Sequence, residues 1–167
     1  MTALRELFIE TWAAGDEPRR RFRIAKLVLA APDIDVQVVK QRLSAEKLPA
    51  GVGQLTIYTS TKDKAIGIAE TLFAGDRGRI GTFGIGEVTE AEKEMLASRE
   101  NLAIVEFEGE VADRFGHSYY RTNPAASSDF LIFMQTGAAP GTPERPLQHK
   151  GLVFWKIPAN YPNNVPQ

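Results

Sequence analysis

Residues 26–31 read Lys-Leu-Val-Leu-Ala-Ala, and Pro32 ends the run. Because the run is apolar at consecutive positions, both of its faces require burial, which favours a strand inside a parallel sheet. Residues 54–59 (Gln-Leu-Thr-Ile-Tyr-Thr) and 101–107 (Asn-Leu-Ala-Ile-Val-Glu-Phe) are similarly rich in β-branched, aromatic and other apolar side chains. We therefore predict three parallel strands that lie side by side in chain order.

Helical patterns alternate with these strands. Apolar residues at helical spacing predict a first helix over residues 2–13, and Pro124 begins another that runs to about Gln135. Three further helices are predicted over residues 35–43, 62–73 and 88–98. This alternation is typical of an α/β fold in three layers, with right-handed crossovers between the strands.

Composition narrows the classes of function. The chain has 167 residues, no cysteine and two histidines, His117 and His149. A disulfide scaffold, a thiolate metal site and a cysteine nucleophile are thereby excluded, and we expect neither a metal nor a cofactor. The net charge of −1 gives no electrostatic reason to expect a nucleic-acid partner. We therefore interpret the arginine-rich connector over residues 16–23 as a solvated loop.

The sequence also gives expectations about location and organisation. No segment approaches the ~18 apolar residues of a membrane span, and Glu6 and Glu10 interrupt any signal-peptide core. A cytoplasmic location is the default expectation. We predict one α/β unit over residues 1–135 and a proline-rich, irregular tail over residues 136–167, with a short edge strand at residues 152–157.

Candidate catalytic residues follow each of the three predicted strands. Functional groups in open parallel sheets gather beyond the carboxyl ends of the strands. Here the first strand leads to Asp33, the second leads to Asp63 and the third leads to His117. An acid followed by a histidine is the order of the last two members of a hydrolytic Ser–acid–His triad. Asp33 is the alternative acid, although a turn role suits it better, and His149 is expected to be exposed.

Three segments together carry a resemblance to a known family. Residues 27–35 (LVLAAPDID), 57–66 (IYTSTKDKAI) and 116–120 (GHSYY) resemble the C-terminal half of an α/β hydrolase, in an uncharacterised, esterase-like bacterial branch. The resemblance covers about residues 4–133. It implies a partial α/β-hydrolase fold made of the last three parallel strands with flanking helices, and a small-molecule ester as substrate.

The resemblance also assigns roles to single residues. It implies that Asp63 is the triad acid, that His117 is the base and that the helix over residues 2–13 follows the nucleophile turn. The family's G-x-S-x-G turn is absent from the chain, and none of the six serines occupies such a turn. Ser118, beside His117, lacks the second glycine and is a poor candidate. Met1 falls just after the position of the missing serine.

From this we expect a truncated or internally started chain whose complete form is a serine esterase or lipase, and which is inactive as written. The alternative is a non-catalytic α/β module that acts by binding. Three strands leave unpaired backbone groups at a sheet edge, so we expect self-association through that edge. An upstream reading frame encoding a strand and a G-x-S-x-G turn would favour the hydrolase, whereas a stop codon before Met1 would favour the module.

Overall fold

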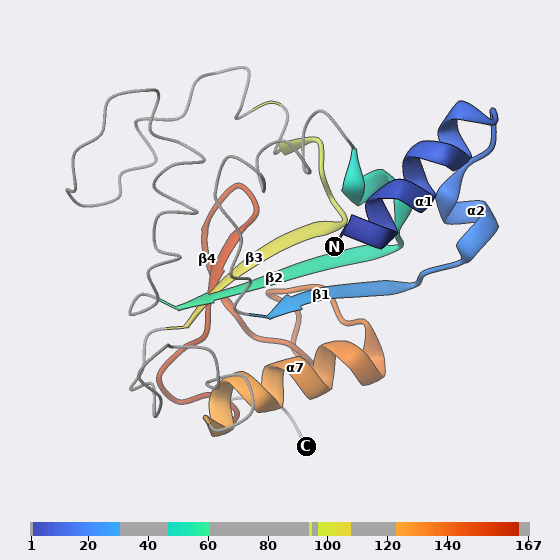
Figure 1. The fold of residues 1–167 in the computed structure, drawn as a ribbon. Helices are drawn as coiled ribbons and strands as arrows, with labels where there is room; N and C mark the ends of the chain where they lie inside the picture. Colours follow the sequence, from blue (N-terminus) through green and yellow to red (C-terminus); the bar gives the residue numbers. More distant parts are fainter. Residues whose placement is uncertain (1, 31–46, 61–93, 95–96, 108–122, 164–167) are drawn as a thin grey trace.

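The computed structural model describes residues 2–30, 47–60, 94, 97–107 and 123–163, and within them a five-stranded sheet has the order β1-β2-β3-β5-β4 (Figure 1). The elements are α1 (Thr2–Ala13), α2 (Pro18–Phe22), β1 (Lys26–Ala30), the 3₁₀ helix η1 (Leu48–Gly51), β2 (Gln54–Ser60), β3 (Leu102–Phe107), α7 (Pro124–Thr136), β4 (Gln148–Gly151) and β5 (Phe154–Lys156).

The first three strands confirm the predicted order and direction. β1 pairs with β2 and β2 pairs with β3, both in parallel. β5 continues the sheet in parallel on the other side of β3, and β4 pairs with β5 in the antiparallel direction. Near the carboxyl ends of the strands, Ala30 lies opposite Tyr58, and Ser60 lies opposite Phe107.

Helices cover both faces of the sheet. In Figure 1, α1 and α2 lie on one side and α7 lies on the other. Side chains alternate along the strands, so that Leu55 and Ile57 face α1 whereas Tyr58 faces α7. The layers therefore enclose two apolar clusters, and the chain has the predicted three-layer α/β arrangement. The core on the α1 side comprises Phe8, Leu48, Val52, Leu55, Ile57, Leu102, Ile104 and Val153, and the core on the α7 side comprises Tyr58, Ala103, Val105, Phe107, Ala126, Leu147, Ile157 and Tyr161.

Phe8 organises the first of these cores. Its side chain is 1% exposed, and its ring lies 5.8 Å from that of Trp12 and 6.1 Å from that of Phe22. Gly51 of η1 sits directly against the Phe8 ring, where a Cβ atom would overlap the ring carbons. A residue without a side chain is therefore required where η1 passes under α1.

The arginine-rich connector differs from its predicted form. Pro18 starts a short helix, α2, which ends where Arg23 adopts a left-handed conformation with φ 52°. Pro18 and Phe22 turn inward, while the arginines between them are exposed. The prediction of a loop was wrong because burial of Pro18 and Phe22 holds this segment against the rest of the protein. The solvation of the arginines was predicted correctly.

The ends of α7 fix its direction relative to the strands. The Asn123 side chain accepts hydrogen bonds from the first-turn amides of α7, and Gly137 ends the helix with φ 70°. Near that end, Lys26 Nζ donates to the carbonyl of Met134, and Gln54 Nε2 donates to the carbonyl of Gly137. Since Lys26 and Gln54 begin β1 and β2, the C-terminus of α7 lies at the amino ends of the strands. Its N-terminus therefore points toward their carboxyl ends.

The segment after α7 is more ordered than an irregular tail. Where one short strand over residues 152–157 was predicted, the structure has β5 at Phe154–Lys156 and also β4. Leu147, Val153 and Ile157 are buried. The predicted helices at residues 35–43 and 62–73 lie outside the described residues, as does most of the one at 88–98.

Candidate functional site

The carboxyl ends of β2 and β3 are adjacent, as the sequence predicts for a site at this edge. β2 ends at Ser60 and β3 ends at Phe107, and these two residues are paired. Asp63 follows Ser60 by three positions, and His117 follows Phe107 by ten. Asp63 and His117 themselves lie outside the described residues, as do the alternative acid Asp33 and the serine Ser118.

Of the four serines that the structure describes, Ser60 is the last residue of β2 and the other three lie on helices or turns. Ser127 Oγ donates to the carbonyl of Asn123 at 2.9 Å, and lies 3.3 Å from that of Pro124, which holds it within the first turn of α7. Ser128 is half-buried on the same helix, and the Ser98 amide donates to the carbonyl of Glu94. None of these three residues follows a strand in the way that a nucleophile turn requires.

His149 is exposed, as predicted. It lies on β4, where its Nε2 is 3.0 Å from the carbonyl oxygen of Leu152. Its ring also packs at 4.5 Å from that of Trp155. β4 is separated from β2 by β5 and β3 in the sheet. His149 therefore does not belong to the predicted site at the ends of β2 and β3, and it can serve as a control for His117.

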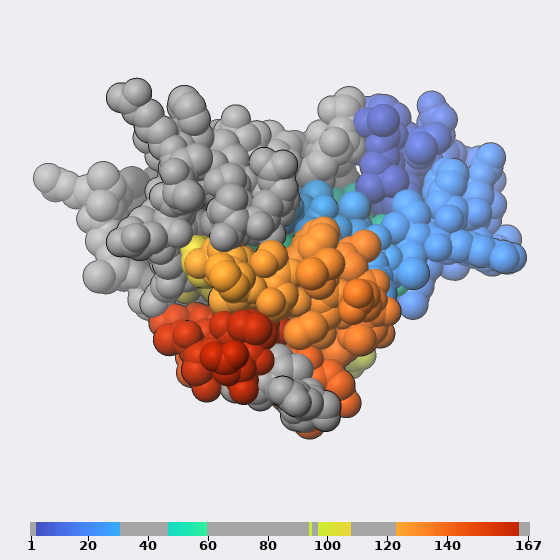
Figure 2. Space-filling view, turned by 90° about the horizontal axis from the view of Figure 1, so that it is seen from below, coloured from blue at the N-terminus to red at the C-terminus, as the bar shows by residue number. Residues whose placement is uncertain are grey.

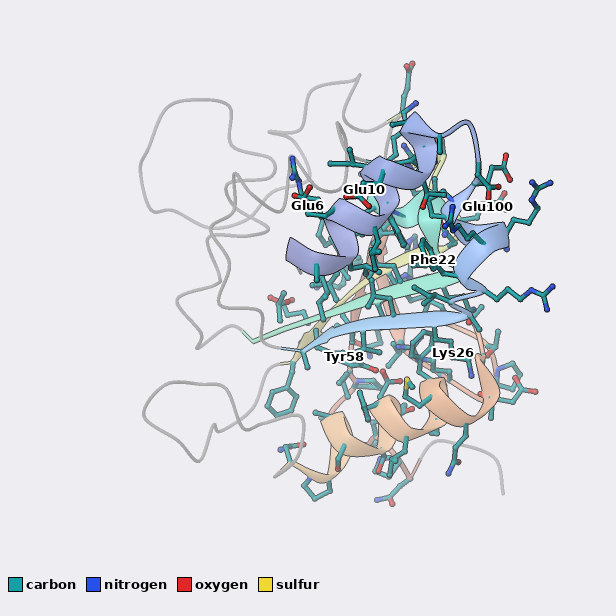
Figure 3. All side chains as sticks on the ribbon, turned by 45° about the vertical axis from the view of Figure 1, so that its right-hand side comes forward. Glu6, Glu10, Phe22, Lys26, Tyr58 and Glu100 are labelled. Atoms are coloured by element: carbon teal, nitrogen blue, oxygen red, sulfur yellow. The ribbon has the colours of Figure 1, made fainter. Side chains whose placement is uncertain are left out.

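A buried polar network lies between the sheet and α7. Its centre is the Asp129 carboxylate of α7, which is 0% exposed. The Oδ1 atom accepts from Arg145 Nε at 2.9 Å and from the Tyr161 hydroxyl at 3.0 Å. The Oδ2 atom accepts from Arg145 Nη2 at 2.8 Å and from the Tyr58 hydroxyl at 2.7 Å. Figure 3 shows Tyr58 on the α7 side of the sheet and Phe22 on the opposite side.

The Arg145 guanidinium is enclosed as completely as its partner. Its side chain is 0% exposed, and its Cζ lies 4.8 Å from the centre of the Phe133 ring. Within the described part of the chain, Nη1 is buried without a hydrogen-bond partner. Burial acts to lower the pKa of Arg145, but the hydrogen bonds to Asp129 and the charge of that carboxylate outweigh it and raise the pKa. Arg145 therefore stays charged opposite Asp129.

The two tyrosines remain hydrogen-bond donors. Burial, reinforced by the negative charge of Asp129, raises the pKa of Tyr58 and of Tyr161 above the ordinary tyrosine value. Together with Arg145, they use four acceptor positions of the Asp129 carboxylate. A carboxylate with four acceptor positions filled has none left for a substrate proton. The network therefore joins β2, α7 and the segment after α7 through one fully hydrogen-bonded carboxylate.

Sequence reasoning missed this network, although one local signal points to it. Ala126, Asp129 and Phe133 share one face of α7, and all three are buried. A carboxylate on the buried face of an otherwise apolar helix requires a buried partner. The partner could not be identified from the sequence, because Arg145 and Tyr161 lie in the segment for which no regular structure was expected.

The described residues hold no group of three or more metal-ligating side chains. None of the described helices has both the length and the apolar character needed to cross a membrane.

Comparison with known proteins identifies the family. No curated protein and no solved structure gives a significant match. The family model described as alpha/beta hydrolase of unknown function (DUF900) matches residues 1–133, which is most of the chain. The match spans the helices and strands from α1 to β3 and most of α7, whose layered arrangement agrees with an α/β-hydrolase-like fold. This chain belongs to the family of alpha/beta hydrolases of unknown function.

Proposed function

We propose that this protein supplies the acid and the base of a serine hydrolase that cleaves small carboxylic esters. Membership of an alpha/beta hydrolase family supports the proposal. The observation that carries it is the parallel pairing of β2 with β3, whose carboxyl ends lead in sequence to Asp63 and His117. Two loops that leave neighbouring strands at one edge are suited to hold an acid beside a histidine.

The proposed mechanism is acyl transfer. A serine outside these 167 residues attacks the ester carbonyl, and His117 Nε2 takes the proton from its hydroxyl group. The tetrahedral intermediate then expels the alcohol, which receives that proton from His117. Water hydrolyses the acyl-enzyme by the same two proton transfers and releases the acid. Asp63 accepts a hydrogen bond from Nδ1–H of His117 throughout, which fixes the tautomer. These steps require neither a metal nor an organic cofactor.

Ester turnover in matched histidine variants tests the proposal. The 167-residue chain and a longer form, extended along its reading frame to include a G-x-S-x-G turn, are assayed with p-nitrophenyl butyrate. We expect the longer form to be active, and His117→Ala to lower kcat by about 10³-fold or more. His149→Ala, which changes the exposed histidine of β4, should leave kcat within about twofold. Equal rates in the two variants would show that His117 is not the base.

Two further comparisons separate the alternatives within this proposal. Asp63→Asn should lower kcat strongly while Asp33→Asn should not, and the reverse result would assign the acid to Asp33. The 167-residue chain alone should show no turnover. Robust turnover by that chain, abolished by Ser118→Ala, would refute the external serine and assign the nucleophile to Ser118.

A second candidate function is binding through the β1 edge of the sheet. Among the described residues β1 pairs only with β2, and its sequence, Lys-Leu-Val-Leu-Ala, is apolar and half-buried. Unpaired strand edges of this kind accept a further strand. Sedimentation velocity over a range of concentrations tests for self-association at this edge. Association that Ala30→Lys weakens favours this function, whereas a chain that stays monomeric at all concentrations contradicts it.

A further inference from the structure

The family match ends at residue 133, but the sheet and its two apolar cores include residues beyond that point. Residues 138–163, here called the C-terminal strap, follow α7 and return along the sheet. Figure 2 shows their red atoms lying against the orange atoms of α7 on one face of the molecule. The strap contributes buried side chains to both sides of the sheet, since Val153 belongs to the α1-side core and Leu147 and Ile157 belong to the α7-side core.

The strap completes the hydrogen bonding of Asp129. The matched region supplies one donor to this carboxylate, the Tyr58 hydroxyl. The strap supplies the other three hydrogen bonds, two from Arg145 and one from Tyr161. Arg145 is also the buried positive charge that compensates Asp129. Without the strap, α7 would present an uncompensated carboxylate on its apolar face, which is strongly unfavourable.

The strap also covers an edge of the sheet. β3 reads Leu-Ala-Ile-Val-Glu-Phe and is buried along most of its length, and β5 pairs with it over residues 104–106. An apolar strand of this composition, left at an edge, is a template for aggregation. With β5 in place, the outer strand is β4, whose Gln-His-Lys sequence is exposed and whose register shifts between His149 and Gly151. Polar residues and irregular register are features that natural edge strands use against aggregation.

We propose that the C-terminal strap is an intramolecular docking element that caps β3 and is latched to the α/β unit by Arg145 on Asp129. The domain of this protein then extends at least to Tyr161, beyond the end of the family match. The proposal does not depend on hydrolase activity, because each contact that carries it lies within the described core.

Cleavage of the connection between α7 and the strap tests the proposal in the full chain. A recognition site for a specific protease is inserted between Ala138 and Ala139, and the folded protein is cut and applied to gel filtration. We expect the two fragments to elute together. Arg145→Met should speed dissociation of the strap fragment by about 10²-fold or more, as for the loss of one partner of a buried ion pair. Arg19→Met, which removes an exposed arginine of α2, should have no effect.

Tyr161→Phe keeps the test informative if Arg145→Met does not fold. This variant removes a single hydrogen bond from the strap to Asp129, and we expect dissociation about tenfold faster. Release of the strap should be followed by aggregation of the larger fragment, measured by light scattering. Fragments of the otherwise unchanged protein that separate without denaturant would overturn the docking role. A larger fragment that loses the strap and stays monomeric and folded would overturn the capping of β3.

Discussion

Replacement of Arg145 by methionine tests whether the buried ion pair stabilises the whole fold. Methionine keeps a long apolar side chain beside the Phe133 ring but removes the positive charge. Asp129 then loses two of its four hydrogen bonds and stays buried with those from Tyr58 and Tyr161. Removing one partner of a buried pair costs about 3–5 kcal/mol. That is a large part of the ~5–15 kcal/mol by which a domain is stable.

Urea and thermal unfolding, followed by circular dichroism, measure this loss. For a chain of this size, a loss of about 3–5 kcal/mol lowers Tm by roughly 6–20 °C. Arg19→Met provides the exposed control and should change stability by less than about 0.5 kcal/mol. In the double variant Asp129→Asn with Arg145→Met, the buried charge is removed as well. We expect the double loss to be about 1–3 kcal/mol smaller than the sum of the single losses. The reasoning would be refuted if Arg145→Met lost no more stability than Arg19→Met. It would also be refuted if the losses of the two single variants added up to the loss of the double variant.

Three other predictions concern packing, capping and pH. Gly51→Ala places a Cβ against the Phe8 ring and should destabilise by about 1–3 kcal/mol in urea unfolding, and an unchanged midpoint would contradict this contact. Asn123→Ala removes the side-chain acceptor for the first-turn amides of α7 and should cost about 1 kcal/mol, with a Ser substitution recovering most of it. Because the pKa of Tyr58 and of Tyr161 is raised in the folded state, stability should fall as pH rises past about 10, where the unfolded tyrosines lose their protons. Each Tyr→Phe change should make the fall of unfolding free energy with pH shallower, by up to about 1.4 kcal/mol per pH unit. If both variants kept the pH dependence of the unchanged protein, the raised tyrosine pKa values would be contradicted.

The parallel sheet could be predicted because the sequence of each of its first three strands indicates a buried strand by itself. The apolar and β-branched character of β1, β2 and β3 is local to each segment, and burial on both faces follows from it. The start of α7 could be predicted from Pro124, which suits a first helical turn. The order of an acid and a histidine after the strands made Asp63 and His117 candidates, and the family resemblance assigned their roles; the structure supports the adjacency of β2 and β3 alone. Their roles stay predictions.

The remaining structure depends on contacts between distant segments. β4 reads Gln-His-Lys-Gly, which has no strand pattern, and it forms a strand only because β5 lies beside it. The partners of Asp129 lie 71 positions before it, at Tyr58, and 16 positions after it, at Arg145. A carboxylate on the apolar face of a helix, such as that of Asp129, indicates that a buried partner exists. The sequence does not indicate which basic residue that partner is. Such pairing is set by the tertiary fold.

The two edge strands of the described sheet, β1 and β4, differ in how readily they could pair with a further strand. This difference bears on both proposed functions. β4 has exposed polar side chains and a register shift, so that a further strand would pair with it poorly. β1 has neither feature, and within the described residues it is hydrogen-bonded on one side only. We therefore expect an additional strand, whether from this protein or from a second copy, to pair with β1 rather than with β4. Growth on that side leaves the carboxyl ends of β2 and β3 in place, so a larger sheet and the proposed Asp63–His117 site are compatible.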